Sequence, residues 1–288
     1  MMHSKRRYFL AWILLPVCLV MWAAFTPAPP KPSRVPLRIV SMNGAISEML
    51  CDLGLEEQIV GVDVTSTYPH SLQSKPRIGH NRNISAEGVL ALSPTLVLGL
   101  KSQVTPTLQA QFRQAGVKVV LLDQVFSATG VGDMLTEVAA AVQKSDEANA
   151  LRQAFDTKMQ ALKMPALQKK VLFIYARGAG TMLVSGTGTS VDAMIKLAGA
   201  RNAVQGFSDF KPLSAESLVV AQPDVILMFP DGLQSMGGVE GLLKVPGVAQ
   251  TPAGKARKII TMDGELLTGF GLRLPEAIRE LHDKIQAE

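Results

Sequence analysis

The chain has 288 residues, of which 47% are hydrophobic and 18% are charged. This composition excludes a disordered chain and is typical of a packed globular protein, with enough length for two ordinary domains or one large one. The net charge of +5 includes Lys5, Arg6 and Arg7. Without these three cations the net charge is about +2, which is too little for a strong phosphate-binding field. We therefore expect no nucleic-acid partner.

The N-terminus has a basic start followed by an apolar run from Tyr8 to Phe25. This pattern is typical of a secretory signal, although the small residues that follow give only weak cleavage sites. An uncleaved anchor is the alternative, because about 17 apolar residues are just enough to span a bilayer. Residues 1–28 are thus interpreted as a signal peptide or an N-terminal anchor, and residues 29–36 as a stiff Pro-rich tether. Either interpretation predicts an exported protein.

Only two cysteines are present, and Cys18 lies in the apolar leader. The other, Cys51, falls on the expected buried face of a helix and has no intramolecular partner. An exported protein without disulfides is more typical of the bacterial periplasm than of small extracellular scaffolds.

Beyond the tether, short apolar runs alternate with helical patterns, which indicates an α/β fold. In chain order the expected strands are residues 37–41, 59–63, 95–100 and 117–122, then 170–175, 225–229 and 258–262. The expected helices include residues 45–55, 105–116 and 190–200.

The two halves of this pattern resemble each other. "ISAEGVLALSPTLVLGL" begins at Ile84 and "LSAESLVVAQPDVILMF" begins at Leu213, at a constant offset of 129 residues. In each copy the serine is expected to cap a helix, with the glutamate in its positively polarised first turn. An offset this long does not fit a solenoid and suits two lobes of the same kind, which we assign to residues 37–143 and 167–288.

A helical pattern at residues 144–166 separates the two lobes. It predicts one helix of about 20 residues, roughly 30 Å long, capped by Ser145 and stopped by Pro165. A single rigid helix would limit hinge closure, and the ligand is expected between the lobes at the carboxyl ends of the strands. The apolar positions of the pattern are Ala148, Leu151, Phe155, Met159 and Leu162.

Motifs of enzymes are weak or absent. The G-x-G of "GTGTSVDA" at Gly186 lacks a third glycine, and "SDFK" at Ser208 lacks the companions of an S-x-x-K acyl enzyme. The sequence has no P-loop, no G-x-S-x-G, no zinc-spaced histidine pair and no C-x-x-C-H. We therefore expect a protein that is not an enzyme.

Five stretches carry a family resemblance: "RIVSMNGAISEML", "IGHNRNISAEGVLALSPTLVL", "TSVDAMIKLAGARNAV", "FKPLSAESL" and "LLTGFGLR". From about Leu37 onwards the chain resembles the haem-binding periplasmic proteins of bacterial haem ABC importers, within the cobalamin and siderophore binding-protein class. The resemblance implies two Rossmann-like lobes joined by a single long backbone helix, with a ligand cleft between them. It also implies haem b as the transported ligand, an ABC permease with its ATPase as partners, and a monomer in the periplasm.

The resemblance also implies the iron ligand. The family's usual ligand is a tyrosine in a Gly-Tyr-x-Arg pattern; here His80 occupies that position and Arg82 keeps the arginine. A neutral imidazole is equally a haem ligand, so His80 is the expected axial ligand. Arg82 then suits a haem propionate, because guanidinium groups pair well with carboxylates. His70, in the preceding loop, is a rival ligand.

Further residues are candidates for the pocket. Tyr175, at the carboxyl end of an expected strand, is a possible distal ligand or a ring that stacks on the porphyrin. The other candidates for propionate or pocket contacts are Arg177, Arg273, Lys211 and Met42.

Glu87 and Glu216 belong to the two Ser-Ala-Glu copies. In the family a glutamate on each lobe docks onto arginines of the permease, and these two positions match that role. The alternative is that both only complement their helix dipoles.

Two alternatives to haem transport remain open from the sequence. The same fold could bind cobalamin or a ferric siderophore, which needs no axial ligand, so that a His80 substitution would be silent. An exported haem-sensing protein or enzyme belongs to a different class. Addition of hemin separates these alternatives by the presence or absence of a Soret band and of turnover.

Overall fold

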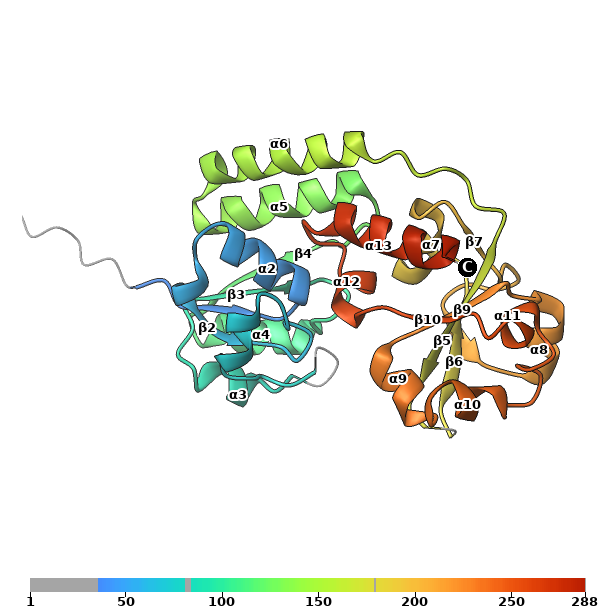
Figure 1. The fold of residues 1–288 in the computed structure, drawn as a ribbon. Coiled ribbons are helices and arrows are strands. Elements are labelled where there is room, and N and C mark those ends of the chain that lie inside the picture. The colour runs from blue at the N-terminus through green and yellow to red at the C-terminus, as the bar shows by residue number, and fades with distance from the viewer. Residues whose placement is uncertain (1–35, 81–83, 179, 288) are drawn as a thin grey trace, which may run out of the picture. The chain divides into compact units, whose positions relative to one another are not determined.

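The computed structural model describes residues 36–80, 84–178 and 180–287. Residues 37–287 fold around two sheets, one in each lobe, with helices packed against them (Figure 1). The first sheet is entirely parallel and the second is mixed. This arrangement confirms the predicted α/β class with two Rossmann-like lobes.

The sheet of the first lobe has the strand order β2-β1-β3-β4. The chain therefore places β2 on one side of β1 and then crosses over to place β3 on the other side. Its strands are almost continuously apolar, as expected where helices cover both faces of a parallel sheet. All four coincide with expected strands: β1 (Ile39–Ser41), β2 (Ile59–Val62), β3 (Leu96–Leu100) and β4 (Lys118–Leu122).

Helices sandwich this sheet because successive strand residues point to opposite faces. Ile39 packs with α2 and α5 on one face, whereas its neighbour Val40 packs with α3 and α4 on the other. The helices of this lobe are α2 (Gly44–Asp52), η2 (Glu56–Gln58), η3 (His70–Ser74), α3 (Ala86–Leu90), α4 (Pro106–Gln114) and α5 (Ala128–Val142).

The sheet of the second lobe has the order β10-β9-β5-β6-β8, and β7 pairs with β5. The three expected strands are observed as β5 (Lys170–Ala176), β9 (Val225–Met228) and β10 (Ile259–Thr261). The sequence did not predict β6 (Met182–Ser185), β7 (Arg201–Asn202) or β8 (Phe210–Pro212), which are short and flanked by turn residues.

The helices of the second lobe follow the same alternation with strands. The expected helix at residues 190–200 is observed as α7. The set is α7 (Ser190–Leu197), α8 (Ala215–Ala221), α9 (Pro230–Ser235), α10 (Gly238–Leu243), α11 (Pro252–Lys255), α12 (Gly264–Thr268) and α13 (Leu274–Gln286).

The linking helix α6 spans Ser145–Ala161, which is 17 residues and shorter than expected. Ser145 is its first helical residue; the cap is Lys144, which makes no side-chain capping bond, so the predicted serine cap is wrong. The helix ends four residues before Pro165, because a proline cannot donate to the carbonyl of Ala161. Residues 162–169 complete the connection without helix or strand.

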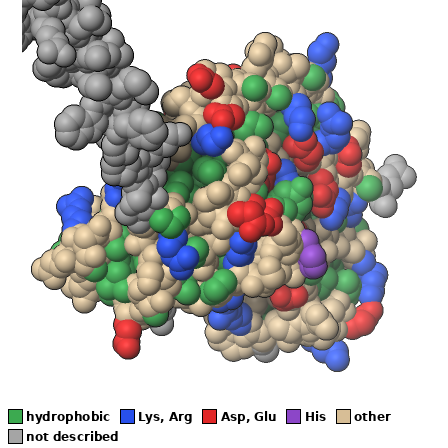
Figure 2. All heavy atoms as spheres, turned by 90° about the vertical axis from the view of Figure 1, so that its left-hand side faces the viewer, with side chains coloured by type: hydrophobic (Ala, Val, Ile, Leu, Met, Phe, Trp, Pro, Cys, Tyr) green, Lys and Arg blue, Asp and Glu red, His purple; other side chains and the backbone are tan. Residues whose placement is uncertain are grey.

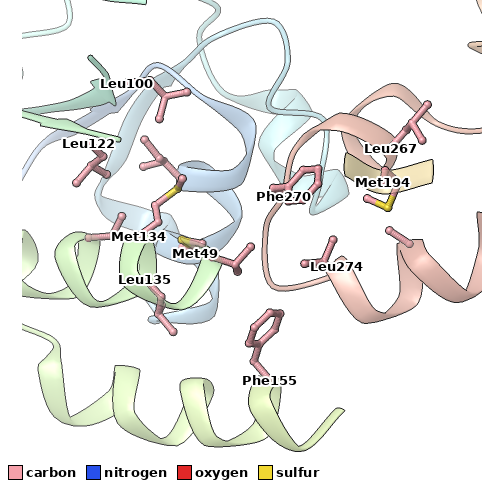
Figure 3. Packing of buried hydrophobic residues seen from close by; sticks show 14 of the residues in the cluster. Met49, Leu100, Leu122, Met134, Leu135, Phe155, Met194, Leu267, Phe270 and Leu274 are labelled. Atoms are coloured by element: carbon pink, nitrogen blue, oxygen red, sulfur yellow. The ribbon is translucent and has the colours of Figure 1, made fainter. Parts of the chain in front are cut away.

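One hydrophobic cluster runs through both lobes. It joins Met49 and Leu135 of the first lobe to Phe270 and Leu274 of the second, as Figure 3 shows. The ring of Phe126 packs against that of Phe270 with centroids 5.2 Å apart. Because each fully buried side chain of this size contributes about 1.5–3 kcal/mol, a wide opening at this junction would cost many such contacts.

Within the described residues, no helix combines the length and the apolar character needed to cross a bilayer. On the face shown in Figure 2, acidic and basic side chains are intermixed rather than gathered into one basic field. The predicted signal peptide or anchor, and the tether as far as residue 35, lie outside the described residues.

Candidate ligand-binding site

His80 is positioned by a segment that runs along β2. The amide of Val62 donates to the carbonyl of Pro76 at 3.0 Å, and the amide of Ile78 donates to the carbonyl of Val62 at 3.0 Å. These bonds carry the chain in parallel with β2 and past its carboxyl end. Gly79 turns the chain there with a φ of 103°, which favours glycine. His80 follows as an exposed side chain at the carboxyl edge of the sheet.

The loop that follows β2 is held by a buried polar cluster. The carboxylate of Asp63, which is fully buried, accepts hydrogen bonds from the hydroxyls of Thr65 at 2.6 Å and Ser66 at 2.7 Å. Arg77 donates to the carbonyls of Asp63 and Ser66 at 2.8 and 2.9 Å. Because Arg77 belongs to the segment that carries His80, the loop and that segment form one unit.

Tyr175 occupies the carboxyl end of β5, a central strand of the second sheet. Its ring packs edge-on against Phe229 at 6.2 Å, and Phe229 packs in turn against Phe173 at 5.0 Å. The guanidinium of Arg177 lies 5.8 Å from the centre of the Tyr175 ring. A phenol with an adjacent positive charge thus lies on a strand of the sheet, and Arg177 itself is exposed.

The carboxyl edges of the two sheets meet at a junction of three charged residues. Arg273, at the start of α13, donates from Nε to Oε2 of Glu48 on α2 at 2.8 Å, and its Nη2 forms an ion pair with the same oxygen at 2.8 Å. Glu265 on α12 accepts from the amide and hydroxyl of Thr67 at 3.0 and 2.6 Å and from the amide of Tyr68 at 3.1 Å. The guanidinium of Arg273 also stacks on the Tyr68 ring, 3.7 Å from its centre.

The two carboxyl groups of this junction are held in unusual electrostatic surroundings. Burial raises the pKa of Glu48 to about 7, although the hydrogen bond from Arg273 acts against this shift. Burial likewise raises the pKa of Glu265, against the hydrogen bonds from Thr67. The Oε1 atoms of both residues are buried without a hydrogen-bond partner among the described atoms. Both residues line one small cavity, which has room for about one water molecule.

Two pocket predictions need correction. Met42 has no exposed surface and packs beside Gly99 inside the first lobe, so it is a core methionine, the alternative to its place in the pocket. Arg273 already pairs with Glu48 and stacks on Tyr68, so it is not a free partner for a propionate. Moving it would leave Glu48 buried without its counter-charge, which is costly.

The remaining candidates lie at different places. Lys211 is an exposed residue of the edge strand β8, with its ammonium 4.7 Å from the centre of the Phe207 ring. His70 is exposed at the start of η3. Arg82 lies outside the described residues. His282, which was not a candidate, is buried in contrast to His70 and His80 and contacts the carbonyl of Ala198 at 2.9 Å.

Both Ser-Ala-Glu copies have the predicted local structure. The hydroxyl of Ser85 accepts from the amide of Gly88 at the start of α3, and that of Ser214 accepts from the amide of Ser217 at the start of α8. Glu87 and Glu216 lie in the exposed first turns of these helices. The serine caps are therefore confirmed.

Other predictions concern metal binding and Cys51. Among the described residues, no group of three or more His, Cys, Asp or Glu side chains could hold a metal ion. Iron held inside a macrocycle needs only one or two protein ligands. Cys51 is a free thiol among the described residues, and burial raises its pKa to about 12, so it is chemically inert near neutral pH.

Sequence reasoning missed Glu48, Glu265 and Phe229, and treated Tyr68 only as a loop residue. A signal was present for Glu48, since it interrupts the apolar face of the first helix beside Met49 and Leu50. A buried acid requires a counter-charge, and that pointed to an arginine. Which arginine it pairs with depends on the junction of the lobes.

The chain belongs to the periplasmic binding protein family, whose model matches residues 39–266. The structure is similar to that of BhuT, a periplasmic heme-binding protein in complex with two hemes. That match has a TM-score of 0.82 and 41% identity and covers 86% of this chain and 97% of BhuT.

Two further proteins are similar. The heme-binding protein HmuT has a TM-score of 0.78 and 29% identity, over 88% of this chain and 85% of its own. Structures of HmuT also exist with a tyrosine, a histidine or an arginine changed to alanine. The high-affinity heme uptake system protein IsdE of Staphylococcus aureus is 28% identical over 205 residues, 68% of each chain.

Proposed function

We propose that this protein binds haem between its two lobes and delivers it to an ABC-type haem permease. One observation carries the proposal: His80 and Tyr175, two kinds of haem ligand, lie at the carboxyl edges of the two sheets. The bonds from Thr67 and Tyr68 to Glu265 join these same edges. In open α/β folds ligands bind at such edges. The heme-binding relatives support the same class of ligand.

The iron is proposed to bind His80 from the first lobe and Tyr175 from the second. A phenolate with a neighbouring guanidinium suits ferric iron, and the imidazole suits either oxidation state. The alanine variants of HmuT concern the same three residue types, a histidine together with a tyrosine and an arginine that are two positions apart. Tyr175 and Arg177 have the same spacing.

Ligands on opposite lobes allow two arrangements. Both can bind one iron from its two sides, or each can bind one of two stacked haems, as BhuT is found with two hemes. We propose the first arrangement, because His80 and Tyr175 then satisfy both axial positions of a single iron. Lys211, Arg177 and Arg82 remain the proposed propionate partners.

The central experiment is a titration of the purified chain with hemin, followed by absorbance. We expect saturation at one hemin per chain and a Soret band that shifts in His80→Ala and in Tyr175→Phe, each with at least about tenfold weaker binding, or 1.4 kcal/mol. His70→Ala is the matched control and should leave the spectrum unchanged. Saturation at two equivalents would favour the stacked arrangement. An unchanged spectrum in His80→Ala would remove His80 as the ligand, and binding of cobalamin or a ferric siderophore instead of hemin would overturn the proposal.

Delivery is proposed to use Glu87 and Glu216, one exposed acid on each lobe. Such rim charges act mainly by steering encounter and fixing orientation, so their effect should weaken with salt. We expect Glu87→Lys combined with Glu216→Lys to leave hemin affinity unchanged and to abolish transfer into vesicles that contain the permease and its ATPase. Glu57→Lys, at an exposed position of η2 beside the opposite edge of the sheet, is the control for each single reversal, Glu87→Lys or Glu216→Lys, and should leave transfer unchanged. Normal transfer by the double variant would refute the docking role.

The remaining properties follow from the same proposal. We place the protein in the periplasm as a monomer, with haem b as cargo rather than as the cofactor of a reaction, and we expect no catalytic turnover of hemin. Family membership supports a substrate-binding role in transport. Release of a haem degradation product during incubation with a reductant would contradict the non-catalytic part.

A further inference from the structure

Tyr68 is a large aromatic side chain that remains 45% exposed. It lies in the loop after β2, at the same sheet edge as His80. Val64 of this loop is also exposed, at 43%, and its amide donates to the carbonyl of Gly79, the residue before His80. Two exposed apolar side chains therefore share the loop that is joined to the histidine segment.

The junction of the lobes fixes the Tyr68 side chain from one side. The guanidinium of Arg273 is 3.7 Å from the ring centre, which is a close stacking distance. Arg273 is itself held by a hydrogen bond and an ion pair to Glu48, a residue that is only 3% exposed. Since one ring face is covered, the exposed area of Tyr68 belongs to the other face and the ring edge.

Glu265 fixes the backbone beneath the same side chain. Its Oε2 accepts from the amide of Tyr68 and from both the amide and the hydroxyl of Thr67. Glu265 comes from the second lobe, so the loop of the first lobe is held by the partner lobe. Three buried or half-buried charged residues thus constrain one exposed ring.

We propose that Tyr68 is an aromatic wall that stacks on the macrocycle of the bound haem, and that Arg273, Glu48 and Glu265 are its positioning residues. The inference rests on the proposed function and adds a contact with the flat face of the ligand to the bonds with its iron. A porphyrin buries a large apolar face, and aromatic rings contribute more than their area when they stack in an offset geometry.

Preorganisation is the physical reason for so many constraints on one ring. A tyrosine held on one face and at its backbone loses little conformational freedom when a ligand covers its other face. The same geometry explains why Arg273 is unsuited to a propionate. Its charge neutralises Glu48, and its plane supports the ring.

The test compares hemin with metal-free protoporphyrin IX, which presents the same macrocycle without iron. We expect Tyr68→Ala to weaken binding of both ligands by a similar factor of about ten, and Tyr68→Phe to restore it, because the ring and not the hydroxyl makes the contact. His80→Ala should weaken binding of hemin but not of protoporphyrin IX. The thermal midpoint of each variant is measured alongside, so that loss of folding is recognised.

The outcomes are distinguishable. If the unmodified chain binds neither hemin nor protoporphyrin IX, the proposed function itself fails. If it binds both and Tyr68→Ala binds them with unchanged affinity, only the aromatic wall is refuted. A loss for hemin alone in Tyr68→Ala would assign Tyr68 to the iron rather than to the macrocycle, which also overturns the inference.

The positioning role has its own test in a double-mutant cycle. Glu265→Gln keeps a carbonyl oxygen that can accept from Thr67 and Tyr68, whereas Glu265→Ala removes it. We expect Glu265→Ala to weaken protoporphyrin IX binding about threefold and Glu265→Gln to have little effect. In a Tyr68→Ala background the Glu265→Ala effect should vanish, because Glu265 acts through the ring. An equal loss in both backgrounds would show a merely structural role and refute the positioning of Tyr68 by Glu265.

Discussion

The two lobes carry their proposed iron ligands in different ways. His80 follows residues 76–78, which hydrogen-bond to β2 at the edge of a parallel sheet. Tyr175 belongs to β5 inside a mixed sheet and is backed by Phe229 and Phe173. The same α/β plan thus provides one ligand on a loop, held by polar bonds, and one on a strand, held by aromatic packing. The phenol is the more rigidly mounted of the two.

The repeated Ser-Ala-Glu motif makes a similar contrast on a smaller scale. Ser85 and Ser214 cap their helices in the same way, but only Ser214 forms a reciprocal capping box, with Ser217. The helices then differ, since α8 exposes Val219 and Val220 whereas α3 ends at Leu90. The serine cap is thus determined by the local motif, whereas the side chains that each helix exposes to solvent depend on how the helix packs in its lobe.

The largest expected effect is a loss of unfolding free energy on substitution of core residues in the two lobes that carry the proposed ligands. Phe112→Ala and Phe173→Ala each remove a fully buried ring and should lower the free energy of unfolding by about 3–5 kcal/mol, measured by urea denaturation. Only Phe173 contacts the aromatic group behind Tyr175. We therefore expect Phe173→Ala to shift the Soret band of bound hemin and Phe112→Ala to leave it unchanged. A Soret shift of equal size in both variants would show that the aromatic packing behind Tyr175 has no specific effect on the bound hemin.

The next effect concerns the junction that joins the lobes. Burial raises the pKa of Glu48 from 4.5 to about 7, so the folded chain binds this proton more tightly than the unfolded chain. The corresponding stability is complete below about pH 4.5 and is lost as the pH rises towards 7, by an amount on the order of 3 kcal/mol. Above that pH the contribution is constant.

Glu48→Gln should therefore reduce the fall in unfolding free energy between pH 5 and pH 8, measured by denaturant titration at each pH. Glu57→Gln, an exposed position of the same lobe, is the control and should retain the full fall. If Glu48→Gln shows the same pH dependence as the unmodified chain, Glu48 is not the group that titrates.

The smallest effect compares the two capped helices. Ser85→Ala and Ser214→Ala should each cost about 1 kcal/mol of unfolding free energy, because each removes one hydroxyl that accepts from an amide of the first helical turn. Ser217→Ala tests the other half of the capping box, since the hydroxyl of Ser217 accepts from the amide of Ser214, and it should cause a smaller loss. Faster hydrogen exchange at the amide of Gly88 in the first variant and of Ser217 in the second would locate each loss. No loss in Ser217→Ala would mean that the reciprocal bond, from the Ser214 amide to the Ser217 hydroxyl, adds nothing measurable.

Much of the fold could be predicted because its signals are local. Apolar runs of four to six residues between turn residues gave all of β1 to β4, since a strand covered on both faces must be apolar throughout. Serine followed by alanine and glutamate gave the starts of α3 and α8, because a capping hydroxyl needs only the amides of the next turn. The antiparallel strands β6 and β8 were not predicted, since each is short and becomes a strand only through its pairing with a neighbouring strand.

The sequence by itself determined the α/β class, the two capped helices and the family resemblance, and it placed Tyr175 at the end of a strand and His80 in a loop. Only the tertiary structure decided that Met42 is buried and that Arg273 binds Glu48 and supports Tyr68. The reason is physical. Capping and strand formation depend on neighbours within a few residues, whereas Glu48 and Arg273 are 225 positions apart. Their pairing depends on how the two lobes pack, which no local pattern specifies.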